Sequence, residues 1–328
     1  MPYSPATNST GSSQFTHLAT VYYDRLALTS LRKKFMFWKF VDYRSLPKKS
    51  GKLIQFYRYS QLGANTTPTS EGVVGTGLSM AASTTVQATV SQYSDFISFS
   101  DMLVDTAIDS DIVAVGADQL GYRAGLTCDT IIRNEIDSVA ASIDVSLLGD
   151  YFSGADCAAI RTRFAGLDIK PFANGYFPVL AHPYVMYDFI HDPQVGGFQD
   201  IVKETGDAGK ERLFRMEDRG FVARFASCEI WESTNVTLVA GSPNKYRVYF
   251  AGMEALGAID LAGRGPSRSQ DQNSQKFSVR VIKPEPSAAD PEGKIAAFVS
   301  YNFVFVTKVL DTNPYRLRKI DAPCSLGL

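Results

Sequence analysis

The sequence predicts an α+β fold with three parts: an extended strand hairpin, one long helix, and a later set of short strands. The hairpin is predicted by two alternating stretches within a segment, 53–100, that has only three charged residues. The helix is predicted by apolar residues that recur at steps of three and four between 113 and 143. Further alternation between 175 and 310 predicts the short strands.

The hairpin is expected to pair the stretches 53–60 and 85–91, because apolar and polar residues alternate in both. Its apolar face consists of Ile54, Phe56, Val86, Ala88 and Val90. The connection between the strands, 63–77, is long and rich in Gly, Ser and Thr. An isolated two-stranded hairpin is only marginally stable in water. We therefore expect its surface to find partners on another chain; an ordinary surface hairpin with a disordered loop is the alternative.

The long helix is expected to span about 110–143, which corresponds to a length of ~50 Å at 1.5 Å per residue. Asp109 and Asp111 supply capping oxygens at its start. Its apolar stripe consists of Val113, Ala117, Leu120, Ala124, Cys128, Ile131, Ile132, Ile136, Val139 and Ile143. A helix of this length is typical of a structural spine rather than of a small globular core.

Glycines and charges inside this helix lead to two further expectations. Gly116, Gly121 and Gly125 each cost about 1 kcal/mol relative to Ala, which indicates close packing or a bend. Asp129, Arg133 and Asp137 follow one another at steps of four. They are expected to form ion pairs on the outer, solvent-facing side of the helix.

Residues 1–50 are expected to form an arm, because 1–16 is polar and the stretch 32–40 is dense in cations and aromatic residues. Arg32 and Lys33 begin this basic stretch, and Trp38 lies near its end. Contact with nucleic acid is one interpretation of such a cluster. A helix end with a solvated basic face is the other, and the more common one.

The rest of the chain is expected to hold one short helix and several strands. The helix is predicted at 155–165, and a polar exposed loop is predicted at 262–276. Strands are predicted at 175–181, 221–231, 245–252 and 295–310. In the last of these, the alternating apolar residues Val299, Tyr301, Phe303 and Phe305 predict one buried face.

Composition excludes several classes of protein. The 33 Lys and Arg residues nearly balance 34 Asp and Glu residues, so the net charge of −1 argues against a dedicated nucleic-acid-binding protein. The longest apolar runs are too short for a membrane span, and the start lacks the order of a signal peptide. The four cysteines have no paired spacing, which predicts reduced thiols, no disulfide framework and no zinc site. We expect a cytosolic protein without a membrane partner.

The sequence predicts no active site and no cofactor. His182 and His191 lie near Asp188 and Asp192, which suggests a metal site or a base with its orienting acid. Their spacing matches no established ligand pattern, and each lies beside a proline-containing turn. A hydrolase that uses one of these histidines stays open as a separate class, since it needs a nucleophile and an acid within hydrogen-bonding reach. We expect a protein that is not an enzyme.

Five segments resemble, in the same order, those of a family of tailed-bacteriophage major capsid proteins, the coliphage N-four-like one. The match runs from about residue 22 to about residue 320. The segments are GKLIQF (51–56), TTPTSEG (66–72), GYFPVLAHPYVMYDFIHDP (175–193), RMEDRGFVARFASCEIWESTN (215–235) and YFAGMEALG (249–257), and the closing strand through residue 310 follows them.

The resemblance implies the Johnson fold, the Hong Kong phage-type capsid fold that herpesvirus shells and encapsulins share. It divides the chain into an N-terminal arm (1–50), an E-loop (51–92), a peripheral or P domain (93–149 and 296–328, with the spine helix at about 110–143) and an axial or A domain (150–295). The implied function is that of a major capsid protein of the virion. Hexamers and pentamers of the chain, assembled in the host cytoplasm, would enclose double-stranded DNA that they contact non-specifically.

The resemblance also implies scaffolding, portal and cement proteins as further partners, and an interface between subunits. The residues expected at that interface are Arg58, Thr67, Glu71, Val73 and Val74 of the E-loop, with Arg32, Lys33 and Trp38 of the arm. Some relatives crosslink through an E-loop lysine, but this chain has no lysine from 53 to 168. An encapsulin-type nanocompartment shell, which has the same fold, is the alternative function.

Overall fold

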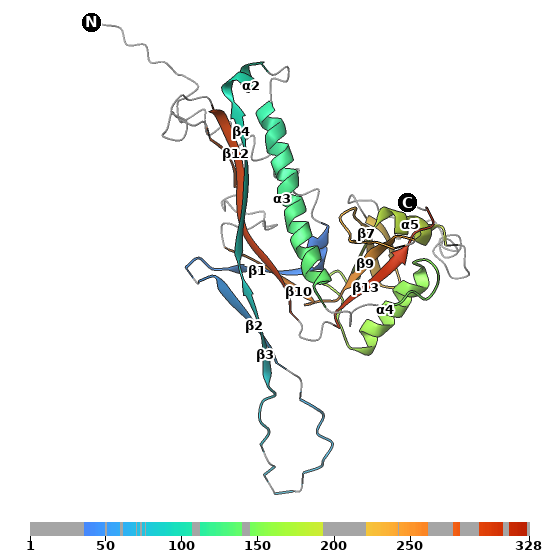
Figure 1. The fold of residues 1–328 in the computed structure, drawn as a ribbon. Coiled ribbons are helices and arrows are strands. Elements are labelled where there is room, and N and C mark those ends of the chain that lie inside the picture. Colours follow the sequence, from blue (N-terminus) through green and yellow to red (C-terminus); the bar gives the residue numbers. More distant parts are fainter. Residues whose placement is uncertain are drawn as a thin grey trace.

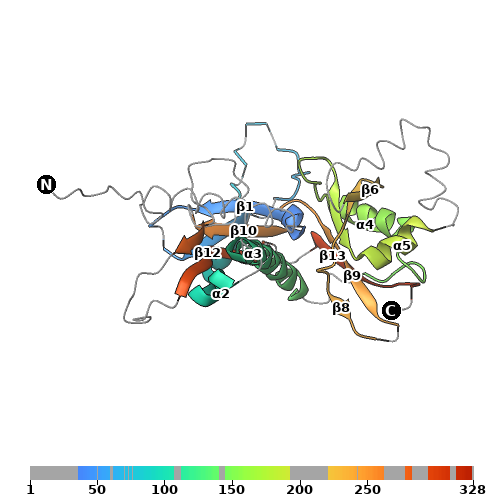
Figure 2. The same cartoon turned by 90° about the horizontal axis from the view of Figure 1, so that it is seen from above.

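A computed structural model describes residues 36–49, 51–59, 62–69, 71–72, 74–75, 77–106, 112–139, 145–192, 221–241, 243–261, 278–282, 295–310 and 315–326. Two sheets form the body of the molecule, and a two-stranded hairpin projects away from them (Figure 1). The view from above shows that the sheets lie beside each other rather than stacked (Figure 2).

The first sheet is five-stranded and is organised around one long strand, β12 (Ile295–Val309). Strands β10 (Leu256–Leu261) and β11 (Ser278–Ile282) pair with β12 antiparallel, and β1 (Val41–Leu46) joins β10 in parallel. Strand β4 (Ser91–Ser100) also pairs antiparallel with β12, over almost its whole length. This long pairing gives the sheet an extended backbone.

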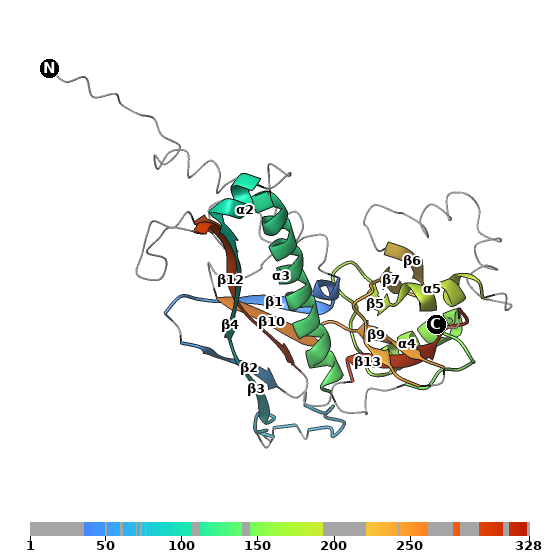
Figure 3. The same cartoon turned by 45° about the horizontal axis from the view of Figure 1, so that its top comes forward.

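Helix α3 (Ile112–Asp137) packs along β12 and β4, on the side of the first sheet that faces the second sheet (Figure 3). The predicted alternation on β12 is confirmed, because Val299, Tyr301, Phe303 and Phe305 are all buried in the main core with the apolar stripe of α3. The predicted close packing is confirmed at Gly116, where an added Cβ would lie 2.4 Å from the Phe99 ring. The helix is shorter than predicted, since Ser138 and Val139 lie beyond its end.

The projecting hairpin pairs β2 (Leu53–Tyr59) with β3 (Ser83–Thr89), as predicted. Only Val90 separates β3 from β4, so one extended stretch of chain runs from the hairpin into the first sheet (Figure 1). The short helix α2 (Asp101–Thr106) follows at the far end of β4. The hairpin is therefore a direct extension of the strand that supports α3.

The second sheet is six-stranded and carries two helices. Its order is β13 (Leu317–Pro323), β9 (Lys245–Ala251), β5 (Phe177–Ala181), β7 (Cys228–Glu232) and β6 (Phe221–Phe225), and β8 (Leu238–Val239) pairs with β9. Helices α4 (Gly154–Gly166) and α5 (Pro183–Ile190) share a second apolar core with this sheet.

Most predicted elements of this region are confirmed, and one needs correction. The helix predicted at 155–165 is α4, and the strands predicted at 175–181 and 245–252 are β5 and β9. The strand predicted at 221–231 is instead a hairpin of β6 and β7. Ala226 and Ser227 have φ values of 47° and 61°, which is the left-handed pair that a tight hairpin turn requires. The loop predicted at 262–276 lies outside the described residues.

The chain just before residue 50 is part of the body. Phe37 and Phe40 of the short 3-10 helix η1 (Phe37–Phe40) are fully buried in the main core, and β1 follows directly. Strand pairing also places β10 with the first sheet and β13 with the second. Within the described ranges, no helix combines the length and apolar character needed to cross a membrane.

Candidate subunit interface

The base of the hairpin is anchored to the outer face of the first sheet. Phe56 and Ala88 are buried there, together with Val90, against Ile259 and Val304. This apolar contact uses the face of β2 and β3 that the alternation predicts. The base is therefore held in a fixed direction, so the hairpin leaves the body at a defined angle.

The opposite face and the tip of the hairpin are exposed. Tyr57 and Tyr59 on β2 are 61% and 63% exposed, and all described residues from 62 to 80 are exposed, without helix or strand. At the tip, Val74 is 96% exposed and Met80 is 79% exposed. Such a concentration of exposed apolar side chains on an element without a core of its own is typical of a contact surface.

The predicted interface residues lie in different settings. Thr67, Glu71 and Val74 lie on the exposed tip, where the Thr67 N–H donates to the Asn65 side chain at 3.0 Å. Arg58 is half-buried on β2. Their role in subunit contacts stays a prediction.

In the arm, the Trp38 ring stacks on Phe305 at 6.0 Å and lies 5.6 Å from the Tyr43 ring, so it packs within its own chain. The remaining predicted interface residues, Arg32, Lys33 and Val73, lie outside the described residues.

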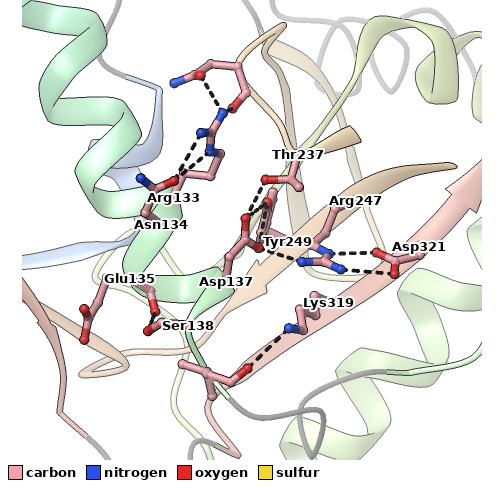
Figure 4. A network of polar contacts seen from close by, with 12 residues as sticks. Arg133, Asn134, Glu135, Asp137, Ser138, Thr237, Arg247, Tyr249, Lys319 and Asp321 are labelled. Atoms are coloured by element: carbon pink, nitrogen blue, oxygen red, sulfur yellow. Dashed lines mark hydrogen bonds and ion pairs between the residues drawn. The ribbon is translucent and has the colours of Figure 1, made fainter. Parts of the chain in front are cut away.

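A polar network joins the end of α3 to the second sheet (Figure 4). The Asp137 carboxylate accepts hydrogen bonds from Arg247 at 3.0 Å, from the Tyr249 hydroxyl at 3.1 Å and from the Thr237 hydroxyl. Arg247 also donates to both oxygens of Asp321, at 2.8 and 3.2 Å. The hydrogen bonds to Asp321, and those to Asp137, raise the pKa of Arg247. The guanidinium stays charged and ties the helix to β9 and β13.

The Asp129 carboxylate holds the N-terminal segment against α3. It is 2% exposed and accepts the N–H groups of Met36 and Phe37, at 3.4 and 3.3 Å. Burial raises its pKa to about 7, and these hydrogen bonds and Arg133 counteract the rise only in part. This contact fixes Met36 and Phe37 against α3.

The prediction that Asp129, Arg133 and Asp137 lie on a solvent-facing side of α3 is wrong. Arg133 donates to the backbone and side-chain oxygens of Asn235, at 3.2 and 2.9 Å, and the two aspartates are engaged as described above. These three residues lie on the side of α3 that contacts η1 and the second sheet. Gly121 and Gly125 precede Asp129 at steps of four, and both are buried. The glycines at these positions were the signal in the sequence that another element packs closely against this side of α3.

The two histidines near residue 190 stabilise α5. His182 accepts the Tyr184 N–H at 3.2 Å as the N-cap, and its ring stacks on Tyr246 at 4.1 Å. Burial lowers the pKa of His182. His191 contacts the Tyr187 carbonyl at 2.8 Å. In the part of the chain that the structure describes, no three His, Cys, Asp or Glu side chains form a group that could hold a metal ion.

Comparison with known proteins shows similarity in structure only. No protein-family model matches the chain, and no curated protein matches it in sequence. The capsid of Ralstonia phage GP4 has a TM-score of 0.63 at 13% identity, over 90% of this chain and 92% of that chain. The capsid of Cyanophage Pam1 has a TM-score of 0.58 at 13% identity, over 90% and 93%.

The fold is also shared outside phages. The holo-SrpI encapsulin complex from Synechococcus elongatus PCC 7942 has a TM-score of 0.51 at 11% identity, over 89% of each chain. The similarity to phage capsids is higher in TM-score and extends over nearly the whole chain. This chain therefore has the Johnson fold that the sequence resemblance predicts.

Proposed function

We propose that this chain is the major capsid protein of a tailed bacteriophage and that it assembles into the icosahedral shell around the double-stranded DNA genome. The projecting hairpin is the observation that supports this most directly. Its base is packed on the first sheet, whereas Val74, Leu78 and Met80 near its tip are 96%, 78% and 79% exposed. A neighbouring subunit is the partner that buries such a surface in a shell of identical copies.

The proposed mechanism is geometric. A hairpin that reaches onto the next subunit makes a heterologous contact, in which two different surfaces of the same chain meet, and such contacts close into rings when the rotation allows. We assign the subunit contacts to Arg58, Thr67, Glu71, Val73 and Val74 in the hairpin, with Arg32 and Lys33 in the arm. Trp38 packs on Phe305 and Tyr43 of its own chain, and only the exposed part of its half-buried side chain is assigned to this contact. Hexamers and pentamers formed in this way would build the shell in the host cytoplasm.

The proposal includes the named parts of the fold and the further partners. We propose the division of the chain into the arm (1–50), E-loop (51–92), P domain (93–149 and 296–328) and A domain (150–295). Two adjustments follow from strand pairing, which favours β1 and β10 as P-domain elements and β13 as an A-domain element. Membership of the coliphage N-four-like family is part of the proposal. So are scaffolding, portal and cement proteins, and non-specific contact with the packaged DNA.

Deletion of residues 63–78 tests this function. The variant should keep the body folded, because none of the described residues in this segment is buried, and it should fail to form closed particles. Circular dichroism measures the folding, and negative-stain electron microscopy with light scattering measures the particles. Normal closed shells from this variant would show that the hairpin is not the assembly element.

A pair of point variants sharpens the test. Val74→Asp places a charge on the tip and should weaken assembly strongly. Leu148→Asp changes an apolar residue that is also well exposed, 64%, but lies outside the hairpin, and should assemble like the unchanged chain. The assignment fails if Leu148→Asp blocks assembly and Val74→Asp does not.

An encapsulin-type nanocompartment shell is the second candidate, and the similarity to the holo-SrpI encapsulin complex favours it. Both functions predict closed particles from the expressed chain. They differ in the content of particles purified from the native source: a phage head holds double-stranded DNA, whereas a nanocompartment holds a cargo protein. Nuclease-protected DNA of genome length would decide for the phage capsid.

A further inference from the structure

Strand β4 has one edge that is open to another chain. Its inner edge pairs with β12, and among the described residues no strand pairs with its outer edge. The Phe96 N–H points away from β12, because it donates to the Asp95 carboxylate at 3.0 Å. Residues two apart in an antiparallel pair direct their peptide groups the same way. The peptide groups of Gln92, Ser94 and Ser98 therefore also lie on the outer edge.

This open edge lacks the common protection against strand addition. Proteins usually protect an exposed edge with lysine or proline residues, or by keeping the strand short. Strand β4 has 10 residues and contains no Lys, Arg or Pro. Its one charged residue, Asp95, is paired with Arg123 of α3 at 2.8 Å. On the face away from α3, Phe96 is 64% exposed and packs edge-on against Phe298.

The hairpin tip of a second copy has the properties that match this edge. The described residues from 62 to 80 form neither helix nor strand, and none of those from 74 to 80 takes part in a backbone hydrogen bond with another described residue. Val74, Leu78 and Met80 supply exposed apolar side chains. The hairpin extends from the start of β4 in the direction away from α2 (Figure 1), so a tip that lies along β4 must come from another chain.

We propose that the hairpin tip of one subunit adds as a strand to the outer edge of β4 in its neighbour. This inference rests on the proposed function and names the surface that receives the hairpin. Backbone hydrogen bonds along the edge would supply the affinity, and Phe96 with Phe298 would receive apolar side chains of the tip. The contact joins two different surfaces of the same chain, which is the heterologous geometry that a ring of subunits needs.

A proline on the outer edge tests the backbone contact. Ser94→Pro removes one outward N–H, a change that an edge strand tolerates when this group does not pair within the sheet. The variant should keep the circular dichroism spectrum of the unchanged chain, and its yield of closed particles should fall by about tenfold or more. The matched control, Ser94→Ala, keeps the N–H and should assemble normally. Normal assembly of Ser94→Pro, or an equal loss for Ser94→Ala, would overturn the proposal.

Disulfide trapping gives an answer even if Ser94→Pro fails to fold. Particles are assembled from two differently tagged chains, one with Cys at position 92, 94 or 98 and the other with Cys at 74, 78 or 80. The four natural cysteines are buried, so the new thiols are the exposed ones. At least one combination should give a band of twice the subunit mass that carries both tags. Thr162→Cys, on the exposed face of α4, is the control and should give none with the same tip variants.

The remaining outcomes separate this proposal from the proposed function. If no tip position crosslinks to β4, while deletion of residues 63–78 still abolishes particles, the receiving edge is wrong and the function of the hairpin stands. If Ser94→Cys crosslinks instead to Ser12→Cys in the arm of another copy, the occupant is wrong. Normal particles from the deletion would contradict the proposed function itself.

Discussion

Replacement of Asp129 by Asn should remove a pH dependence from the stability of this protein. The Asp129 carboxyl is 2% exposed and accepts two backbone N–H groups from the N-terminal segment. Asn keeps one acceptor oxygen of similar size but cannot ionise. The substitution therefore retains most of the packing while it abolishes the buried negative charge.

The magnitude follows from the pKa. Burial raises the pKa of Asp129 from 3.8 to about 7 in the folded state. The folded state then binds a proton more tightly than the unfolded chain, so the carboxyl stabilises fully below pH 3.8 and this contribution is lost as the pH rises through 7. A pKa difference of this size corresponds to about 4 kcal/mol between the two limits. Asp129→Asn should gain up to that amount relative to the unchanged chain between pH 4 and pH 8.

The assay is equilibrium unfolding of the subunit in urea at a series of pH values, with the free energies of the two proteins subtracted at each pH. Subtraction cancels the titration of groups that both proteins share. Asp118→Asn, at an exposed aspartate of the same helix, is the matched control for the loss of one carboxylate from α3. If the difference for Asp129→Asn varies with pH no more than the difference for Asp118→Asn, the raised pKa of Asp129 and the buried setting on which the reasoning depends are refuted.

Three further predictions concern other parts of the molecule. Gly116→Ala should lower the free energy of unfolding by about 1–3 kcal/mol, because the new methyl group must displace the Phe99 ring, whereas Gly77→Ala meets open space and should have little effect. Arg247→Met should cost about 1–3 kcal/mol and increase hydrogen exchange at the C-terminal end of α3, since it removes the partner of two carboxylates. Boiled particles should give one band near 36 kDa with or without reductant, because the chain has no lysine from 53 to 168 and Lys52 lies at the root of the hairpin; a ladder of larger bands would contradict this.

Periodicity in the sequence located several of the regular elements. Alternation identified the paired faces of β2 and β3, and the buried face of β12, because a strand with one buried face must repeat every two residues. The stripe of α3 followed from the helical repeat in the same way, and the cost of glycine inside a helix predicted the close approach at Gly116. The resemblance to capsid proteins added the fold, which local patterns do not specify.

Other features depended on which elements meet, and local sequence does not encode this. The charges of α3 were assigned to a solvent-facing side, because charged residues are mostly exposed. The second sheet and the segment 36–40 approach that side, so Asp129 became a buried hydrogen-bond acceptor and Asp137 a half-buried one.

One other feature differed from the prediction. The stretch 221–231, predicted as one strand, folds back at Ala226 and Ser227, where the sequence has neither Gly nor Asn to mark a turn.

The four cysteines show the division between sequence and structure most clearly. The sequence determined that they are widely spaced and that no short motif pairs them, and in the structure all four are free thiols. Only the packing of α4 on the β6–β7 turn brought Cys157 and Cys228 together across 71 residues. Contacts between distant segments arise when apolar faces are buried against one another, and several partners can satisfy one apolar face. The sequence therefore determined the faces, and the tertiary structure decided which faces meet.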